Sequence, residues 1–269
     1  MKVYWLEQAV ADVPAEDGWL SATEVTRLNT MRFAKRRADW RLGRWTAKRA
    51  LAAHLKLAAG LQPLAAIEIR PASTGAPEAF LQGNPAAVAI SLSHRAGRAI
   101  CAIAQSGVAL GCDLEMIEER SYAFVADYFT AQEQDLIGQV SAGDHYRLVA
   151  LLGSGKESAL KALGEGLRLD TRSVAITPIS GLRPPERPDG WRPLEARCGE
   201  GQVLHGWWQQ EGSLLRTVIA TPPPEAPILC DLHHDPHARD AGSCAISRIA
   251  RNYIRIQYSL IDSALMVTL

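Results

Sequence analysis

The sequence predicts a fold that contains both helices and strands, and three observations support this. Charged and apolar residues recur at helical spacing in two stretches, 37–57 and 145–163. Short apolar runs that fit buried strands lie between them, at 87–92 and 99–104. The chain has 269 residues, which allows one compact unit or two small subdomains, and either can bury a sizeable core.

The first predicted elements are a strand over 2–10 and a helix that begins near Ser21. Ser21 and Glu24 form a capping-box pattern, which marks a helix start. A strand is then expected over 64–70, followed by a turn over 74–77. The strands at 87–92 and 99–104 are joined by a segment that contains His94, and a lone histidine at a strand end is usually structural.

The most basic stretch of the chain is a predicted helix that runs to about residue 57. Arg37, Arg41, Arg44 and Lys48 are spaced four, three and four residues apart, so they form one stripe along it. A solvated basic face is the ordinary interpretation of such a stripe. A stripe of one sign with few acids nearby is also what a phosphate-rich ligand requires.

Two short acidic patterns follow, one on a strand and one on a helix. Asp113 and Glu115 come after an apolar run and point to the same face of a predicted strand. Glu157 and Lys161 lie one turn apart on a helix, where an exposed ion pair is the ordinary interpretation. Together, the three carboxylates and the lysine could hold Mg²⁺ against a phosphate-bearing substrate.

The second half is predicted to contain a helix over 124–128, a capped helix and the long helix over 145–163. For Glu133 we expect a capping role beside Thr130 rather than a catalytic one. Gly153 and Gly155 each cost about 1 kcal/mol against alanine inside the long helix, so it is expected to be weak there. A loop is expected over 181–193, and strands at these ranges: 174–179, 203–209 and 214–220.

A proline-rich stretch over 221–227 is predicted to end this part of the chain. Beyond it, Cys230 and a group of histidines raise a zinc hypothesis, but their spacing matches no zinc finger. Residues 246–269 could form one short helix or strand. We treat everything after residue 221 as an extension.

Bulk composition excludes some classes of protein. Lys and Arg number 29 and so do Asp and Glu, so no global basic field favours nucleic acid. The five cysteines include no C-x-x-C pair, which suits a reducing cytosol. No apolar run has the length of a membrane span, and the N-terminus lacks the apolar core of a signal peptide. A cytoplasmic protein is expected.

The motifs G-C-D-L-E (111–115) and K-E-S-A-L-K (156–161) resemble those of a known family. They are similar to the 4′-phosphopantetheinyl transferases of the two-subdomain, surfactin-synthetase-activating type. That family has the pattern [VI]-G-[ICV]-D-x-E, a gap of some forty residues, and then W-[ST]-x-K-E-[AS]-x-x-K. The resemblance runs from near the N-terminus to about Thr221. It departs from the pattern at Gly153, where the family has Trp, and at Gly155 and Ala76.

The resemblance implies an α+β fold with two pseudo-symmetric subdomains, each a small antiparallel sheet packed on a long helix. The N-terminal subdomain would span 1–106. The C-terminal one would span 107–221 and carry the Mg-binding motifs. Residues 222–269 would form a Pro-rich linker and an extension of unknown structure.

The resemblance also implies an activity: transfer of 4′-phosphopantetheine from coenzyme A to a serine of an apo acyl or peptidyl carrier protein. The products would be the holo carrier protein and adenosine 3′,5′-bisphosphate. The partners would be coenzyme A and the carrier protein, without nucleic acid or membrane, and the chain would be a monomer. Its residues would have these roles: Mg²⁺ ligands Asp113, Glu115 and Glu157; catalytic Glu157 and Lys161; coenzyme A contacts Arg41, Arg44, Lys48, His94 and Lys161.

Two alternatives stay open. One is a weakly active or inactive relative that binds coenzyme A or a carrier protein, because Gly153 and Gly155 loosen the helix that carries Glu157. The other is a different Mg²⁺-dependent phosphoryl-transfer or phosphodiester enzyme that shares the spacing.

Overall fold

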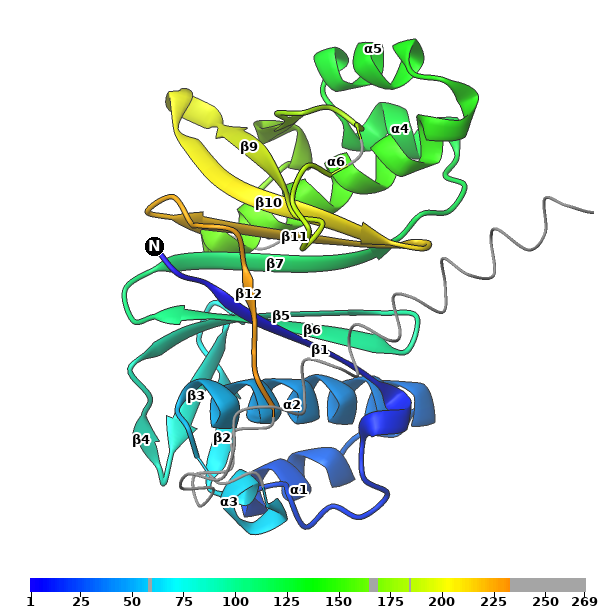
Figure 1. The fold of residues 1–269 in the computed structure, drawn as a ribbon. Helices are drawn as coiled ribbons and strands as arrows, with labels where there is room; N and C mark the ends of the chain where they lie inside the picture. Colours follow the sequence, from blue (N-terminus) through cyan, green and yellow to red (C-terminus); the bar gives the residue numbers. More distant parts are fainter. Residues whose placement is uncertain (58–59, 165–168, 184, 233–269) are drawn as a thin grey trace, which may run out of the picture. The chain divides into compact units, whose positions relative to one another are not determined.

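The computed structural model describes residues 1–57, 60–164, 169–183 and 185–232, which belong to one compact unit. They confirm the mixed α+β fold, with six α-helices and three small sheets in the described part of the chain. The arrangement is consistent with two subdomains in which a sheet packs on a long helix (Figure 1).

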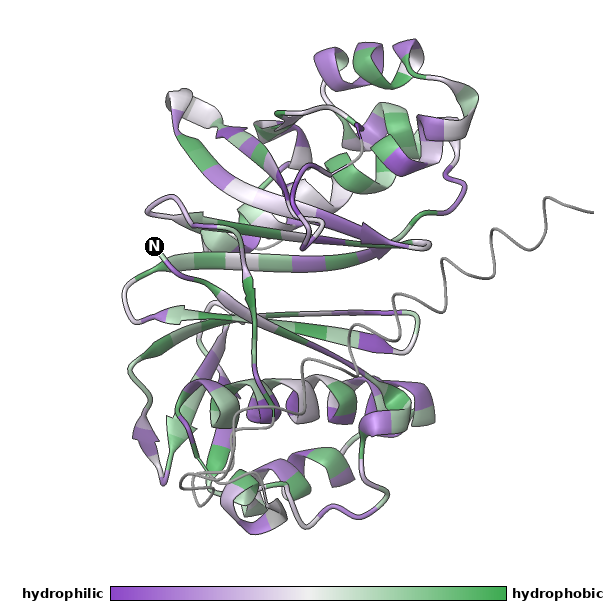
Figure 2. Ribbon diagram, viewed as in Figure 1, coloured by the Kyte–Doolittle hydropathy of each residue, from purple (hydrophilic) through white to green (hydrophobic). Residues whose placement is uncertain are grey.

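The N-terminal half packs a four-stranded sheet on the long helix α2 (Ala34–His54). Its strand order is β12-β1-β6-β5, with these bounds: β1 (Tyr4–Ala9), β5 (Val88–Arg95), β6 (Arg98–Gln105) and β12 (Ile228–Leu229). The pairs β1–β6 and β5–β6 are antiparallel, as predicted, whereas β12 runs parallel to β1. In Figure 2, α2 carries both green apolar and purple polar residues, as expected for a helix with one buried face.

Smaller elements complete this half: α1 (Ala22–Asn29), α3 (Leu61–Ala65), β2 (Ile67–Pro71), β3 (Pro77–Leu81) and β4 (Asn84–Pro85). The last three form a separate sheet in the order β2-β3-β4. Strand β2 begins at Ile67, so the prediction of a strand over 64–70 is wrong at its start. Pro63 lies in the first turn of α3, where its fixed φ and missing N–H suit a helix start.

The C-terminal half packs a five-stranded antiparallel sheet on α6 (Ala142–Ala162). Its order is β7-β11-β10-β9-β8, with these bounds: β7 (Ala109–Met116), β8 (Val174–Pro178), β9 (Arg192–Cys198), β10 (Val203–Glu211) and β11 (Leu214–Thr221). Two short helices, α4 (Tyr122–Tyr128) and α5 (Ala131–Gln139), precede α6. Strand β9 was not predicted, although its first five residues alternate between buried and partly exposed, because it follows a loop rich in Pro and Arg.

The two sheets pack face to face through a shared apolar cluster that includes Trp5, Ile100, Cys112, Trp191 and Val218. The opposite face of each sheet packs against its own helix. Strands at the centre are thus buried on both faces, which explains the unbroken apolar run over 99–104. The order of layers is α2, sheet, sheet, α6 (Figure 1).

The residues after 221 do not all form a separate extension. Ile228 N–H donates to the Val3 carbonyl at 2.9 Å, and Cys230 N–H donates to the Trp5 carbonyl at 2.8 Å. Cys230 is buried in the apolar core of the N-terminal half, and this burial raises the pKa of its thiol to about 12. Such a thiol is a poor zinc ligand. The histidines of the zinc hypothesis and the element predicted over 246–269 lie outside the described residues.

One buried ion pair anchors each half. In the N-terminal half, Glu24 closes the capping box of α1 with Ser21, and it also accepts a hydrogen bond from Ile69 N–H at 3.1 Å. The Lys48 ammonium lies 2.5 Å from Glu24 Oε2 and donates to the Trp19 carbonyl at 2.9 Å. The pair thereby joins α1, α2 and β2.

The C-terminal half repeats this arrangement. Glu133 closes the capping box of α5 with Thr130, which confirms the predicted capping role, and it accepts from Ile176 N–H at 2.9 Å. The Lys156 ammonium lies 2.7 Å from Glu133 Oε2 and donates to the Thr171 carbonyl at 2.9 Å. In both halves, a capping glutamate accepts a backbone N–H from a strand and pairs with a buried lysine, which also donates to a backbone carbonyl. This recurrence supports the predicted pseudo-symmetry.

Candidate functional site

The acidic strand β7 lies directly against helix α6 because Gly111 has no side chain. A Cβ atom at Gly111 would lie 1.8 Å from the Ser158 carbonyl oxygen, so only glycine permits this approach. The close contact brings Lys161 over the strand, where its ammonium donates to the Cys112 carbonyl and to Asp113 Oδ1, each at 2.9 Å. Two motifs almost fifty residues apart in the sequence therefore meet here, as predicted.

Asp113 is the buried centre of this cluster. Its Oδ1 also accepts a hydrogen bond from Ser93 Oγ at 2.7 Å, so β5 contributes to the site as well. Burial favours the protonated form, but Lys161 and the Ser93 hydroxyl outweigh it and lower the pKa of Asp113. Asp113 is therefore a fixed anion at the junction of the two halves.

Glu157 is a half-exposed carboxyl one turn before Lys161. Its Oε2 lies 4.0 Å from Lys161 Nζ. Burial, followed by the negative charge of Asp113, raises the pKa of Glu157 to about 7. A carboxyl group with this pKa can accept a proton near neutral pH.

Glu115 shares a strand face with Asp113, but its carboxylate does not meet the other two. Its Oε1 lies 2.9 Å from Arg95 Nε and 3.3 Å from Arg120 Nη2. Among the residues that the structure describes, no group of three or more His, Cys, Asp or Glu side chains is arranged to hold a metal ion. The predicted three-carboxylate set is therefore brought together only in part.

Asp113 and Glu157 nevertheless fit a divalent cation. Burial raises the pKa of Glu157, and the negative charge of Asp113 adds to this effect, so the two carboxylates repel each other. A hard cation with oxygen ligands would relieve it. The donor set thus suits Mg²⁺, with two carboxylates in place.

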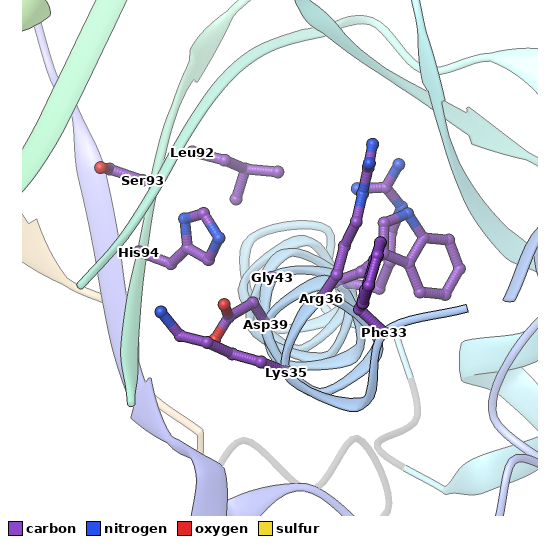
Figure 3. A pocket seen from close by; sticks show the side chains of 10 residues that line it. Phe33, Lys35, Arg36, Asp39, Gly43, Leu92, Ser93 and His94 are labelled. Atoms are coloured by element: carbon purple, nitrogen blue, oxygen red, sulfur yellow. The ribbon is translucent and has the colours of Figure 1, made fainter. Parts of the chain in front are cut away.

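A cavity of about 510 Å³ lies between α2 and β5, next to this cluster. Figure 3 shows Leu92 and His94 extending from their strand toward the helix that carries Lys35 and Asp39. Arg44 also lines the cavity, so two of the predicted coenzyme A contacts, Arg44 and His94, face the same space. Burial lowers the pKa of the Arg44 guanidinium.

A second cavity, of about 250 Å³, is lined by Lys161 and Leu92. It is lined by the predicted turn over 74–77, in which Gly75 adopts φ +90°, and by Ser91 of β5. Lys161 thus faces a space large enough for part of a ligand, and Leu92 lines both cavities.

Arg41 and Lys48, two further predicted coenzyme A contacts, are engaged by other protein groups in this structure. The Lys48 side chain is 0% exposed and is engaged by Glu24, so it does not reach either cavity. The Arg41 guanidinium donates to the Pro14 carbonyl at 2.5 Å and pairs with Asp17 at 2.9 Å. Arg37, Arg41 and Lys48 of the basic stripe hold residues 14–28 in place, because buried carbonyls and acids need cationic donors as much as a phosphate does.

Sequence reasoning missed several residues of this region. Lys35 and Arg36 line the first cavity, and Ser93 holds Asp113. Arg36, Trp40 and Arg44 are spaced four residues apart, so they share one face of the helix. This spacing could have indicated that Arg36 lines the same cavity as Arg44. The Ser93–Asp113 contact has no local signal, since it joins two strands of different sheets.

The two glycines of α6 differ in their surroundings, which yields a prediction. A Cβ at Gly155 would lie 3.0 Å from Ile176 atoms, whereas one at Gly153 would lie 3.8 Å from Phe129, an ordinary contact. Gly153→Ala is therefore expected to stabilise the protein by about 0.5–1 kcal/mol through helix propensity. The matched variant Gly155→Ala should not stabilise, and thermal unfolding of both variants tests this. A gain for Gly155→Ala equal to that for Gly153→Ala would contradict the prediction.

A comparison with known protein families finds a match to the part of the chain that carries the acidic cluster. The model of the 4′-phosphopantetheinyl transferase superfamily matches residues 109–207, a range that contains Asp113, Glu115, Glu157 and Lys161. No curated protein matches the chain. No described helix is long and apolar enough to cross a membrane. The finer surfactin-synthetase-activating type stays a prediction.

Proposed function

We propose that this protein transfers 4′-phosphopantetheine from coenzyme A to a serine of an apo acyl or peptidyl carrier protein, releasing adenosine 3′,5′-bisphosphate. The observation that carries the proposal is the Lys161–Asp113–Glu157 cluster, which borders the Lys161 cavity and lies within the superfamily match. We extend the proposal to a monomeric, cytoplasmic protein that needs neither nucleic acid nor membrane.

Each residue of the cluster has a task in this reaction. Glu157, or a water that it orients, accepts the proton of the carrier serine as general base. The serine oxygen then bonds to the β-phosphorus of coenzyme A while the bond from that phosphorus to the bridging oxygen breaks. Lys161 donates hydrogen bonds toward the pyrophosphate and offsets charge on the leaving bisphosphate.

Asp113 keeps Lys161 charged and oriented for this role. Burial disfavours the ammonium, but the Asp113 carboxylate outweighs it, so the pKa of Lys161 is raised. Asp113 and Glu157 would hold Mg²⁺, which supplies additional positive charge to the pyrophosphate.

Nucleotide binding falls to the residues of the first cavity. Arg44 and His94 face it from opposite sides, and Arg36 and Lys35 add two cations at its rim. In this proposal, these residues have the nucleotide-binding role that was expected of Arg41, Arg44 and Lys48. Phosphate groups remote from the reacting bond supply binding energy for orientation.

The test is mass spectrometry of an apo carrier protein incubated with this protein, coenzyme A and Mg²⁺. We expect the carrier to gain the mass of one phosphopantetheine. Replacement of its acceptor serine by alanine should abolish the gain. No gain across several carrier types, despite measurable coenzyme A binding, would overturn the proposal in favour of a protein that only binds its ligand.

Removal of the metal gives a separate prediction. With excess chelator the mass gain should disappear, and added Mg²⁺ should restore it, because two adjacent carboxylates leave the pyrophosphate charge unbalanced without a cation. Mass spectrometry of the carrier measures both the loss with chelator and the recovery with Mg²⁺. Full transfer in chelator would show that Lys161 and the basic residues suffice.

A further inference from the structure

Arg192, the first residue of β9, is a buried cation, and two of its nitrogen atoms have no acceptor in the described part of the chain. It lies on the face of the sheet that packs on α6, together with Leu194 and Ala196. The residue is 8% exposed, and its Nε and Nη1 atoms are buried and have no hydrogen-bond partner among the described residues. Arginine is rarely buried to this extent unless an anion pairs with it.

Stacking on Trp208 explains only part of this burial. The guanidinium carbon of Arg192 lies 4.0 Å from the centre of the Trp208 ring, and the two residues are opposite each other in the β9–β10 pairing. Stacking uses the flat face of the guanidinium group. The N–H donors lie in the plane of that group and point outward from its edges, so the ring does not accept them.

A second arginine, Arg147 of α6, adds positive charge to this region. Its Nη1 lies 3.3 Å from Asp144 Oδ1, and its Nη2 donates to the Leu182 carbonyl. Its Nε is buried and, within the described ranges, has no hydrogen-bond partner. Burial lowers the pKa of Arg192, and the positive charge of the neighbouring Arg147 lowers it further. Asp144 thus balances one of two neighbouring cations.

The unused donors and the excess charge together favour a small oxyanion. Three buried nitrogen atoms carry N–H groups without an acceptor among the described residues: Nε of Arg147, and Nε and Nη1 of Arg192. Leaving charged donors in this state is unfavourable, and guanidinium groups bind phosphate oxygens strongly. A tetrahedral oxyanion presents four oxygens in different directions, whereas a carboxylate presents two. Donors from a helix and a strand therefore suit phosphate better than a carboxylate.

Burial also limits the size of the anion. The Arg147 side chain is 23% exposed, so the region is reached from the side of Arg147. Arg192 behind it is almost enclosed. A free ion fits this position better than a phosphate ester, because the organic group of an ester needs a wider opening.

We propose that Arg147 and Arg192 form a binding site for free phosphate, which links α6 to β9. This site is separate from the Lys161–Asp113–Glu157 cluster, because Glu157 follows Arg147 by ten residues on the same helix, or about 15 Å along its axis. The proposal goes beyond the proposed function and does not rest on it. Bound phosphate stabilises the C-terminal half by joining two of its elements.

The experiment is equilibrium dialysis of the full chain against radiolabelled inorganic phosphate, with chloride keeping the ionic strength constant. Cations of the first cavity can also bind phosphate, so the chains are compared by difference. We expect Arg192→Met to bind one phosphate fewer than the wild type. The matched control is Arg187→Met, which changes an exposed arginine paired with Asp189 and should bind as many as the wild type. Equal numbers in the wild type and Arg192→Met would overturn the proposal, since stacking on Trp208 would then be the whole role of Arg192.

Thermal unfolding gives a second readout and identifies the form of the anion. Phosphate should raise the Tm of the wild type relative to chloride, and this rise should be smaller in Arg192→Met. Glycerol 3-phosphate, a phosphate ester, and acetate, a carboxylate, should each raise the wild-type Tm less than phosphate does. An equal rise with either compound would overturn the assignment to free phosphate.

Arg147→Met decides the question if Arg192→Met does not fold. Arg147 is the more exposed of the two arginines, so less packing is lost on its replacement. We expect this variant to weaken the binding of the same phosphate by more than about tenfold, because one of the two guanidinium groups is gone. Undiminished binding in a folded Arg147→Met chain would overturn the two-arginine site.

Discussion

Glu157→Gln is expected to lower the rate of phosphopantetheine transfer by about 10²–10⁴-fold, the usual contribution of a general base. Glutamine keeps the shape of the side chain but cannot accept the serine proton, and it removes one charge from the pair with Asp113. The half-exposed position, with Lys161 Nζ 4.0 Å away, means that little packing is lost.

Single-turnover transfer to an apo carrier at saturating coenzyme A measures this effect, and thermal unfolding shows that the variant is folded. Glu195→Gln is the matched control, because Glu195 is a partly exposed carboxylate of β9 whose partner is His205 at 3.8 Å. It should transfer at the wild-type rate. A Glu157→Gln variant that keeps more than about a tenth of the rate would exclude Glu157 as the base.

The acidic cluster was predictable because each part has a local spacing with one geometric meaning. Residues two apart share a strand face, and residues four apart share a helix face. These rules paired Asp113 with Glu115 and Glu157 with Lys161. The meeting of strand and helix came from the family resemblance, and its physical cause is Gly111, whose missing side chain permits backbone contact.

Spacing did not reveal what each charged face contacts. Arg37, Arg41 and Lys48 of the stripe donate hydrogen bonds to the segment 14–28, whereas Arg44 lines the first cavity. Arg95 and Arg120 were not predicted to hold Glu115, because Arg95 lies on another strand and Arg120 lies after the end of β7, so neither pair has a periodic spacing. Tertiary packing decides which carboxylate oxygen pairs with which cation. The spacing of residues within one helix or strand therefore does not predict these pairs.

The buried pair of Lys48 with Glu24 gives the largest expected effect on stability. Lys48→Met should lower the free energy of unfolding by about 3–5 kcal/mol, because Glu24 would keep its charge in the core without its cation. The Lys48 side chain is 0% exposed, so solvent cannot replace it. Lys156→Met removes the corresponding cation next to Glu133, and a similar loss is expected.

Denaturant unfolding of both variants, with coenzyme A affinity measured on the folded fraction, separates two roles for Lys48. A structural role predicts a large loss of stability in both variants and an affinity for coenzyme A near that of the wild type. A phosphate contact predicts the reverse for Lys48→Met: stability near that of the wild type and affinity reduced by more than about tenfold. The contacts to Glu24 and to the Trp19 and Leu64 carbonyls favour the first result, since these three partners engage all three N–H donors of the ammonium and leave none to turn outward.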